Sequence, residues 1–134
     1  MPPIANAADH RPAAEGWFEG NSLVVVCLCA AWCDTCGEFR TTLEAIAEAR
    51  PALRFVWLDI EDDSELCGDV EIENFPTLAI YRGRTLLHFG VSLPTREVVA
   101  RLIDAMDERE GGASGAPQQV LDLPAVLGRT AGPP

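Results

Sequence analysis

The sequence predicts an α/β fold, and three observations lead to that class. Two apolar segments rich in β-branched residues, at 23–29 and 53–60, are typical of buried strands. Apolar residues at helical spacing occupy the chain between them, so the two strands form a right-handed parallel crossover. Two shorter strands at 77–81 and 86–89 are joined by a glycine-centred turn at 82–84, which indicates a hairpin. At 134 residues the chain fits one domain with a real core.

Helices are expected before, between and after these strands. The pattern predicts a short helix over 13–18, a long one over 33–49 that ends before Pro51, and a short one over 62–70. A last amphipathic helix follows Pro94. The residues on its apolar face are Val98, Val99, Leu102, Ile103 and Met106.

Composition predicts where the domain begins and ends. Residues 1–15 are small, polar and proline-rich, which favours an N-terminal tail, and 16–110 form the domain. Residues 111–134 begin with a Gly/Ala/Ser linker and favour a flexible C-terminal tail. The alternative is that the apolar stretch 120–127 docks on a groove of this molecule or of a neighbour.

The net charge limits the classes of partner. The chain carries 21 acidic and 10 basic residues, all of the latter arginine, for a formal charge of −11. This acidity argues against nucleic acid or an anionic membrane as a partner. The longest apolar run is too short to span a bilayer. Many Ala, Gly and Pro residues without lysine suggest a GC-rich, bacterial genome.

The cysteines indicate a reducing compartment. Five of them, at 27, 29, 33, 36 and 67, do not suit a fully paired secreted framework. The N-terminus lacks the basic and apolar regions of a signal peptide, so we expect a cytoplasmic protein. There, a Cys-x-x-Cys motif is expected to be catalytic or metal-binding.

The motif Trp32-Cys33-Asp34-Thr35-Cys36 carries the candidate chemistry. If Cys33 begins a helix, unpaired backbone N–H groups and the helix dipole stabilise its thiolate. That thiolate can attack a disulfide, and Cys36, one turn later, can resolve the mixed disulfide. The motif could alone be half of a zinc site, but its position between a strand and a helix favours redox chemistry, with no metal.

Asn74-Phe75-Pro76-Thr77 forms the second element. Proline lacks a backbone donor and is suited to the start of a strand. An X-Pro bond is also where a cis peptide costs least. A cis bond here would turn the backbone groups of Phe75 toward a bound peptide.

Together these motifs resemble the thioredoxin family over roughly residues 23–106. The matching features are the apolar strand leading into Ala-Ala-Trp-Cys-x-x-Cys, the strand ending in Leu-Asp-Ile-Glu, Phe-Pro-Thr-Leu, Gly83, Gly90 and the final helix. The resemblance implies a central mixed sheet flanked by helices, that is, a thioredoxin fold.

The resemblance also implies roles for individual residues. Cys33 would be the nucleophile, Cys36 the resolving thiol and Pro76 the cis proline, with no bound cofactor. Glu61 matches an acid that can hold the indole of the motif's tryptophan. The substrate-binding residues would be Trp32, Asp34, Thr35, Phe75 and Pro76.

The chain departs from the family pattern near the motif. Asp34 adds negative charge that should oppose a thiolate at Cys33. Cys27 stands where the family has a buried acid, and Trp57 stands where a lysine is common. Asp59 shares a strand face with Trp57 and is the candidate replacement proton acceptor.

The other cysteines and the acidic segment have simpler interpretations. Cys27 and Cys29 fall on one face of a buried strand and are expected to be small apolar residues, although four spaced cysteines could suggest a metal cluster. Cys67 is expected to be structural. Eight carboxylates between residues 59 and 73 are expected to form a solvated surface, or alternatively to select basic partners.

The sequence therefore predicts a protein-disulfide reductase whose partners are client proteins with disulfides and an external reductant or reductase. The alternative from another class is a thioredoxin-like binding or assembly module with little turnover. A third hypothesis, an oxidase or isomerase, requires an oxidising compartment.

Overall fold

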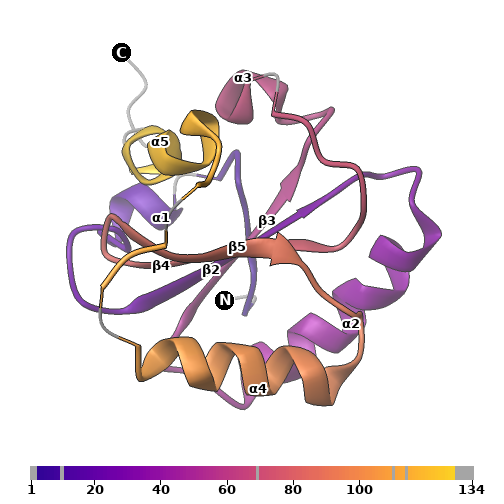
Figure 1. Cartoon of the computed structure of the whole chain (residues 1–134), viewed down its shortest axis with the longest axis horizontal. Helices are drawn as coiled ribbons and strands as arrows, with labels where there is room; N and C mark the ends of the chain where they lie inside the picture. The colour runs from indigo at the N-terminus through magenta and orange to yellow at the C-terminus, as the bar shows by residue number, and fades with distance from the viewer. Residues whose placement is uncertain (1–2, 10, 69, 110, 114, 129–134) are drawn as a thin grey trace.

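Five strands form one mixed sheet in the computed structural model, which describes residues 3–9, 11–68, 70–109, 111–113 and 115–128 (Figure 1). Their order across the sheet is β1-β3-β2-β4-β5. Neighbouring strands run parallel among β1, β3 and β2, while β4 is antiparallel to β2 and β5 is antiparallel to β4. The strands are β1 Ala5–Asn6, β2 Leu23–Cys29, β3 Arg54–Asp59, β4 Thr77–Arg82 and β5 Thr85–Val91.

The predicted parallel crossover is confirmed. Helix α2, Asp34–Glu48, joins β2 to β3, whose register runs from Val24 beside Arg54 to Cys29 beside Asp59. The predicted hairpin is β4–β5, and Gly83 in its turn has φ +58 and lies against the backbone of Gly20. Because an added Cβ there would come within 2.7 Å of a carbonyl oxygen, only glycine fits this position.

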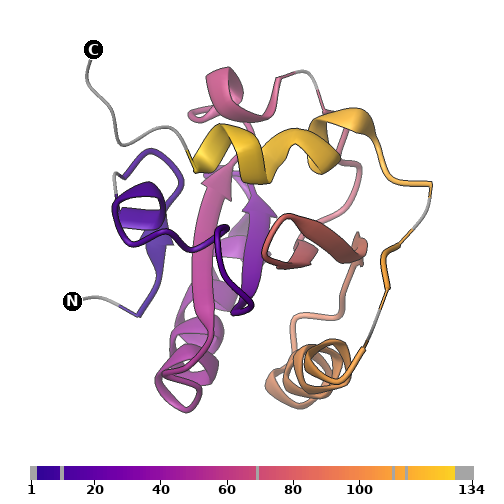
Figure 2. The ribbon, with the colours of Figure 1, turned by 90° about the vertical axis from the view of Figure 1, so that its left-hand side faces the viewer.

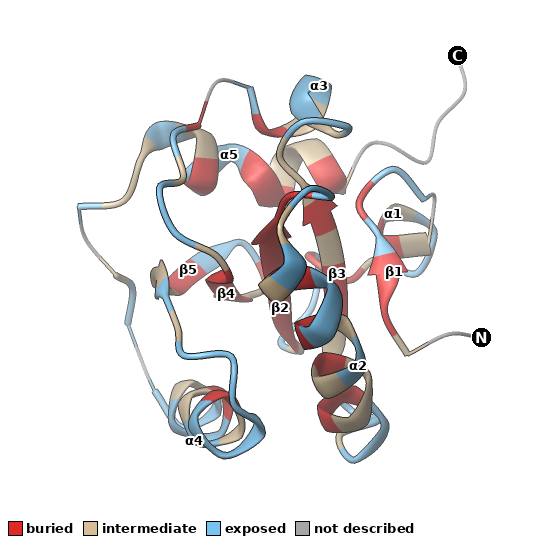
Figure 3. Cartoon of the chain, turned by 90° about the vertical axis from the view of Figure 1, so that its right-hand side faces the viewer, coloured by how far each residue is buried: buried red, intermediate tan, exposed pale blue. Residues whose placement is uncertain are grey.

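The side chains of the central strand alternate between two cores. Leu23, Val25, Cys27 and Cys29 face α2 and α4, Arg96–Asp107. Val24, Val26 and Leu28 face the other core, which includes residues of α3, Ser64–Cys67, and α5, Gln118–Leu127. Helices therefore cover both faces of the sheet, which explains why every residue of β2 is buried (Figures 2 and 3).

The N-terminal segment belongs to the fold, which corrects the expectation of a tail over 1–15. Ala5 and Asn6 pair with Val56 and Trp57 of β3, and Ile4 is buried in the core under α2. A two-residue strand is too short to show a periodic pattern, so the sequence does not reveal it. Residues 1–2 and 10 of this segment lie outside the described residues.

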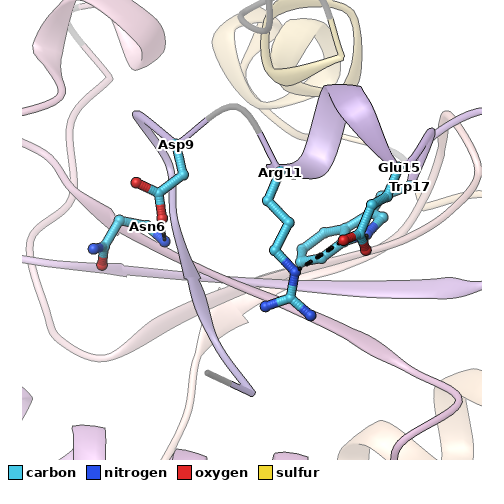
Figure 4. Close-up of polar contacts among 5 residues, drawn as sticks. All are labelled: Asn6, Asp9, Arg11, Glu15 and Trp17. Carbon is cyan, nitrogen blue, oxygen red and sulfur yellow. Dashed lines mark hydrogen bonds and ion pairs between the residues drawn. The ribbon is translucent and has the colours of Figure 1, made fainter. Parts of the chain in front are cut away.

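Polar contacts then fix the chain after β1 (Figure 4). The predicted helix over 13–18 is shorter and earlier, as α1 at Arg11–Ala14, and Gly16 follows it with φ +64. Glu15 accepts hydrogen bonds from Arg11 Nε at 3.3 Å and from Trp17 Nε1 at 2.9 Å. The buried Trp17 ring thereby anchors this segment to the domain.

The C-terminal segment also departs from the expected flexible tail over 111–134. The alternative of docking on the chain's own surface describes it better: α5 buries Val120, Leu123 and Leu127 against the sheet. The connection runs beside β5, where Ala113 N–H donates to Leu86 C=O at 2.7 Å. The cause is tertiary, since the face of the sheet opposite α2 and α4 needs an apolar cover. Residues 110, 114 and 129–134 lie outside the described residues.

Candidate functional site

Cys33 occupies the N-cap of α2, as the motif predicts. A short turn after β2 leads to it, with Cys33 N–H donating to Ala30 C=O at 3.0 Å. Its own carbonyl accepts the first helical hydrogen bond, from Gly37 N–H at 3.2 Å. The residue is half-buried and its thiol is free. Cys33 therefore stands at the positive end of the helix dipole, although its side chain makes no capping hydrogen bond.

Cys36 is bonded to Cys29 in this structure, and not to Cys33. The Cα atoms of Cys29 and Cys36 are 5.8 Å apart, and both residues are buried. Sequence reasoning interpreted Cys29 as a small apolar residue of the strand. The structure confirms that Cys29 is buried, and it adds a disulfide that the sequence does not predict. The available signal was the strand alternation, which turns Cys29 toward the face that α2 covers.

Cys27 extends this sulfur cluster without taking part in the bond. Its Sγ lies 3.7 Å from that of Cys29. Burial raises the pKa of the Cys27 thiol far above its ordinary value, although the positive charge of Arg40 opposes the change. Arg40 itself lies over the Trp57 ring at 5.0 Å. Cys27 is therefore a buried thiol that stays neutral.

Phe75 and Pro76 lie at the same end of the sheet as the cysteines. The antiparallel register places Thr77 beside Leu28, so Pro76 follows at the level of Cys29. The Phe75–Pro76 peptide bond is cis. The Trp32 ring is 66% exposed and meets Phe75 edge-on at a centroid distance of 5.5 Å. An exposed aromatic surface thus borders the free Cys33.

The remaining residues named from the sequence lie around this surface. Asp34 is exposed in the first turn of α2, and Thr35 beside it is half-buried. No hydrogen bond joins Trp32 to Glu61 within the described part of the chain. The indole packs on Phe75 instead.

Asp59 ends β3 directly beside Cys29 in the register. Its Oδ1 accepts hydrogen bonds from the backbone N–H groups of Glu61 and Asp62 at 2.9 and 3.0 Å. Its own N–H donates to Asp63 Oδ2 at 2.9 Å. The carboxylate therefore shapes the turn after β3, and its negative charge acts on the thiol of Cys67.

Cys67 has the environment of a structural thiol. Its side chain is buried, and its Sγ–H lies 3.8 Å from the carbonyl oxygens of Ile60 and Gly68. Burial is the main cause that raises the pKa of this thiol, and nearby Asp63 and Asp59 add to it. Cys67 is thus a poor nucleophile.

The described residues also bear on metal binding and on the spanning of a membrane. Among them, no group of three or more His, Cys, Asp or Glu side chains has the arrangement of a metal site. None of the helices in the described ranges is both long and apolar enough to cross a bilayer.

Solved structures of known proteins share the fold of this chain. A thioredoxin mutant from Halobacterium salinarum superposes with a TM-score of 0.64, covering 83% of this chain and 97% of its own, at 17% identity. Thioredoxin f2 of Chlamydomonas reinhardtii superposes at 0.63, covering 80% and 99%, at 21% identity. The thioredoxin fold expected from the sequence is therefore confirmed.

Sequence relatives agree, over parts of their length. Thioredoxin-2 of Saccharomyces cerevisiae is 34% identical over 64 residues, covering 48% of this chain and 62% of its own. Putative thioredoxin 2 of Streptomyces coelicolor is 39% identical over 62 residues, 46% of each chain. Human sulfhydryl oxidase 1 is 35% identical over 89 residues, covering 58% of this chain but 12% of its own. This chain thus spans less than two thirds of these relatives.

The family model for thioredoxin matches residues 16–104, which is more than half of the chain. That range holds the sheet from β2 onward, the cysteine motif and Pro76. The fold and the family model agree, and the chain belongs to the thioredoxin family.

Proposed function

We propose that this protein is a protein-disulfide reductase that uses Cys33 as the nucleophile and Cys36 as the resolving thiol. The observation that carries the proposal is the free, half-buried Cys33 at the N-cap of a 15-residue helix, beside an exposed aromatic surface. The helix N-terminus favours the thiolate that thiol–disulfide exchange requires.

In the proposed reaction, Cys33 Sγ attacks one sulfur of a client disulfide. The client's other sulfur leaves as a thiolate, and a mixed disulfide joins Cys33 to the client. Cys36 then attacks Cys33 Sγ, which releases the second client thiol and forms the Cys33–Cys36 disulfide. Asp59 accepts the proton of Cys36, in place of the acid that Cys27 replaces.

Substrate binding is assigned to the surface around Trp32 and Phe75. The exposed indole supplies apolar area, and the backbone of Phe75 offers hydrogen-bonding groups to an extended peptide. Asp34 and Thr35 border the same surface from the helix. Pro76 completes the substrate-binding set.

An external reductase would return the oxidised protein to its dithiol form. A thioredoxin f2 has been solved in complex with ferredoxin: thioredoxin reductase, which supports a reductase as the class of partner. We propose a bacterial cytoplasm as the compartment, because a reductase needs its cysteines reduced between turnovers. Neither nucleic acid nor a membrane belongs to the proposed partners.

A steady-state disulfide reductase assay with the full chain tests this proposal. Cys33→Ser should reduce the rate to the uncatalysed background, because no other described thiol combines exposure with a helix N-terminus. Cys67→Ala is the matched control and should keep its rate. Turnover that survives Cys33→Ser would remove Cys33 as the nucleophile.

A binding or assembly module is the second candidate. The observation that favours it is the bond between Cys36 and Cys29, which leaves Cys33 without its resolving thiol in this state. A wild-type protein that captures clients through Cys33 but does not turn over would support the module. A strongly oxidising potential of the Cys33–Cys36 pair would instead favour an oxidase or isomerase.

A further inference from the structure

The Cys29–Cys36 disulfide brings a third cysteine into the candidate site. Cys29 is the last residue of β2, and Cys36 lies in the first turn of α2. Their Cα separation of 5.8 Å is typical of protein disulfides. This bond uses the sulfur that the proposed reductase needs to resolve a mixed disulfide, while Cys33 keeps a free thiol.

We propose that Cys36 exchanges between two partners, Cys33 and Cys29, so that Cys29 is a third exchange cysteine of this site. This inference rests on the proposed function and deepens it. It assigns to Cys29 a chemical role beyond filling the core.

The exchange replaces one disulfide by another. Cys29 Sγ, as a thiolate, attacks Cys36 Sγ in the Cys33–Cys36 disulfide. The bond between Cys29 and Cys36 forms as the bond between Cys33 and Cys36 breaks. The electron pair leaves on Cys33 Sγ, which takes up the proton that Cys29 released, so the step needs no oxidant or reductant.

The placement of the three sulfurs permits this exchange. Cys29 and Cys36 belong to one buried cluster, and Cys33 packs against it from the helix N-terminus. That terminus stabilises the thiolate that leaves on Cys33, and a more stable thiolate leaves faster. Since Cys29 and Cys36 are only 0% and 1% exposed, their disulfide is shielded from bulk reductants.

Cys27 is the neighbouring thiol that could compete with Cys29. Its Sγ lies 3.7 Å from Cys29 Sγ, within range of a sulfur hydrogen bond. Because burial raises the pKa of the Cys27 thiol, Cys27 keeps its proton and can donate a hydrogen bond to Cys29 Sγ. We therefore assign Cys27 a positioning role and no disulfide.

The exchange has a consequence for clients. With Cys36 bonded to Cys29, a mixed disulfide that forms at Cys33 cannot be resolved from within the chain. The protein then holds its client until the external reductant opens the Cys29–Cys36 disulfide, which frees Cys36 to attack the mixed disulfide at Cys33. One chain would thus combine turnover and holding, with Cys29 selecting between them.

Disulfide mapping of the full wild-type chain tests the proposal directly. The protein is equilibrated in glutathione buffers, quenched with acid, alkylated and cleaved before Asp34 and after Trp32. These cuts place Cys29, Cys33 and Cys36 on separate fragments. We expect Cys36 linked to Cys29 in one population and to Cys33 in another. Only Cys33–Cys36 linkage would overturn the inference and leave the reductase intact, whereas only Cys29–Cys36 linkage would overturn both.

Two variants provide an independent measurement. Oxidised Cys33→Ser should lose two of its four remaining thiols by intact mass, and oxidised Cys29→Ala should lose two of its four by forming the Cys33–Cys36 disulfide. The Cys29→Ala/Cys33→Ser double variant is the control and should lose none. If Cys33→Ser keeps all four thiols in buffers that oxidise Cys29→Ala, Cys29 is no exchange cysteine. If Cys29→Ala is folded but inactive and forms no disulfide, the proposed function itself fails.

Discussion

Asp59 can be tested as a proton acceptor without disturbing the turn that it closes. Asparagine keeps the Oδ1 that accepts from Glu61 and Asp62 N–H but loses the charge. We expect Asp59→Asn to slow resolution of the Cys33 mixed disulfide by roughly 10²-fold, the usual scale of general-base assistance. Rapid-quench measurement of client release checks this. Asp62→Asn is the charge-matched control, and an equal rate in wild type and Asp59→Asn would exclude the role.

His88 predicts a pH dependence of stability. Its Nε2 is buried without a hydrogen-bond partner among the described residues. Burial, and then the charge of Arg109, lowers the pKa of His88 below its ordinary value near 6.5. Below that value the unfolded chain binds more protons at this site than the folded chain does. The stabilisation is therefore present above about pH 6.5 and is lost as the pH falls toward the lower folded value.

We therefore expect His88→Gln to lose less stability than wild type between pH 7.5 and 5.5. Urea unfolding of both chains at the two pH values measures the difference, in which the 21 acidic residues common to both cancel. Equal losses would show that His88 has the same proton affinity in the folded and unfolded states. Gln119→Asn, a polar substitution away from His88, is the control.

Among the helices, α5 is held to the sheet by a hydrogen bond that satisfies a carbonyl left without a donor by Pro124. Pro124 has no N–H, so the Val120 carbonyl four residues earlier lacks its helical donor. The buried Tyr81 hydroxyl of β4 donates to that carbonyl at 2.7 Å. The Tyr81 ring also packs edge-on against Phe18 at 5.9 Å, so β4 and the N-terminal segment are tied to α5 together.

Tyr81→Phe should therefore destabilise the fold by about 1–3 kcal/mol, the cost of a buried unsatisfied carbonyl. In a Pro124→Ala background the cost should be smaller, because the backbone N–H that the substitution restores can bond the Val120 carbonyl. A double-mutant cycle by urea unfolding measures the coupling. Equal costs in both backgrounds would contradict this account of α5.

The sequence predicts the elements whose local pattern is clear and misses those that depend on tertiary contacts. Apolar runs rich in β-branched residues predict β2 and β3, helical spacing predicts α2, and a glycine turn predicts the β4–β5 hairpin, all close to their observed bounds. In α5, Val120, Leu123 and Leu127 do have helical spacing, but the linker before it and Pro124 within it both favour a loop. β1 gains its structure only by pairing with β3.

The sequence likewise predicts one part of the candidate site and misses another. The position of Cys33 at the N-cap follows from a local motif and was predicted. The partner of Cys36 depends on how α2 packs over β2, which places Cys29 beside Cys36 across seven residues of sequence. The alternation along β2 indicates the face on which Cys29 lies, but no local pattern places its sulfur beside that of Cys36.

At the scale of the whole molecule, the net charge of −11 should act on clients before they reach Cys33. Part of that charge lies near the aromatic surface. Glu71 and Glu73 are exposed, just before Phe75, and line a shallow pocket with Phe89 and Val91 of β5. Asp69, in the same acidic segment, lies outside the described residues. A negative field here attracts cationic clients and repels anionic ones.

We therefore expect kcat/KM for a cationic peptide disulfide to fall several-fold between 10 and 150 mM salt, since the screening length shrinks from about 30 to about 8 Å. An anionic peptide of the same length should show the opposite trend. Glu71→Gln/Glu73→Gln should weaken the salt dependence for the cationic peptide. The matched control is Glu48→Gln/Glu108→Gln, at the C-terminal ends of α2 and α4, with the same change in net charge. If both pairs alter the salt dependence equally, total charge steers clients; if neither does, the acidic segment is a solvated surface without a role in selecting partners.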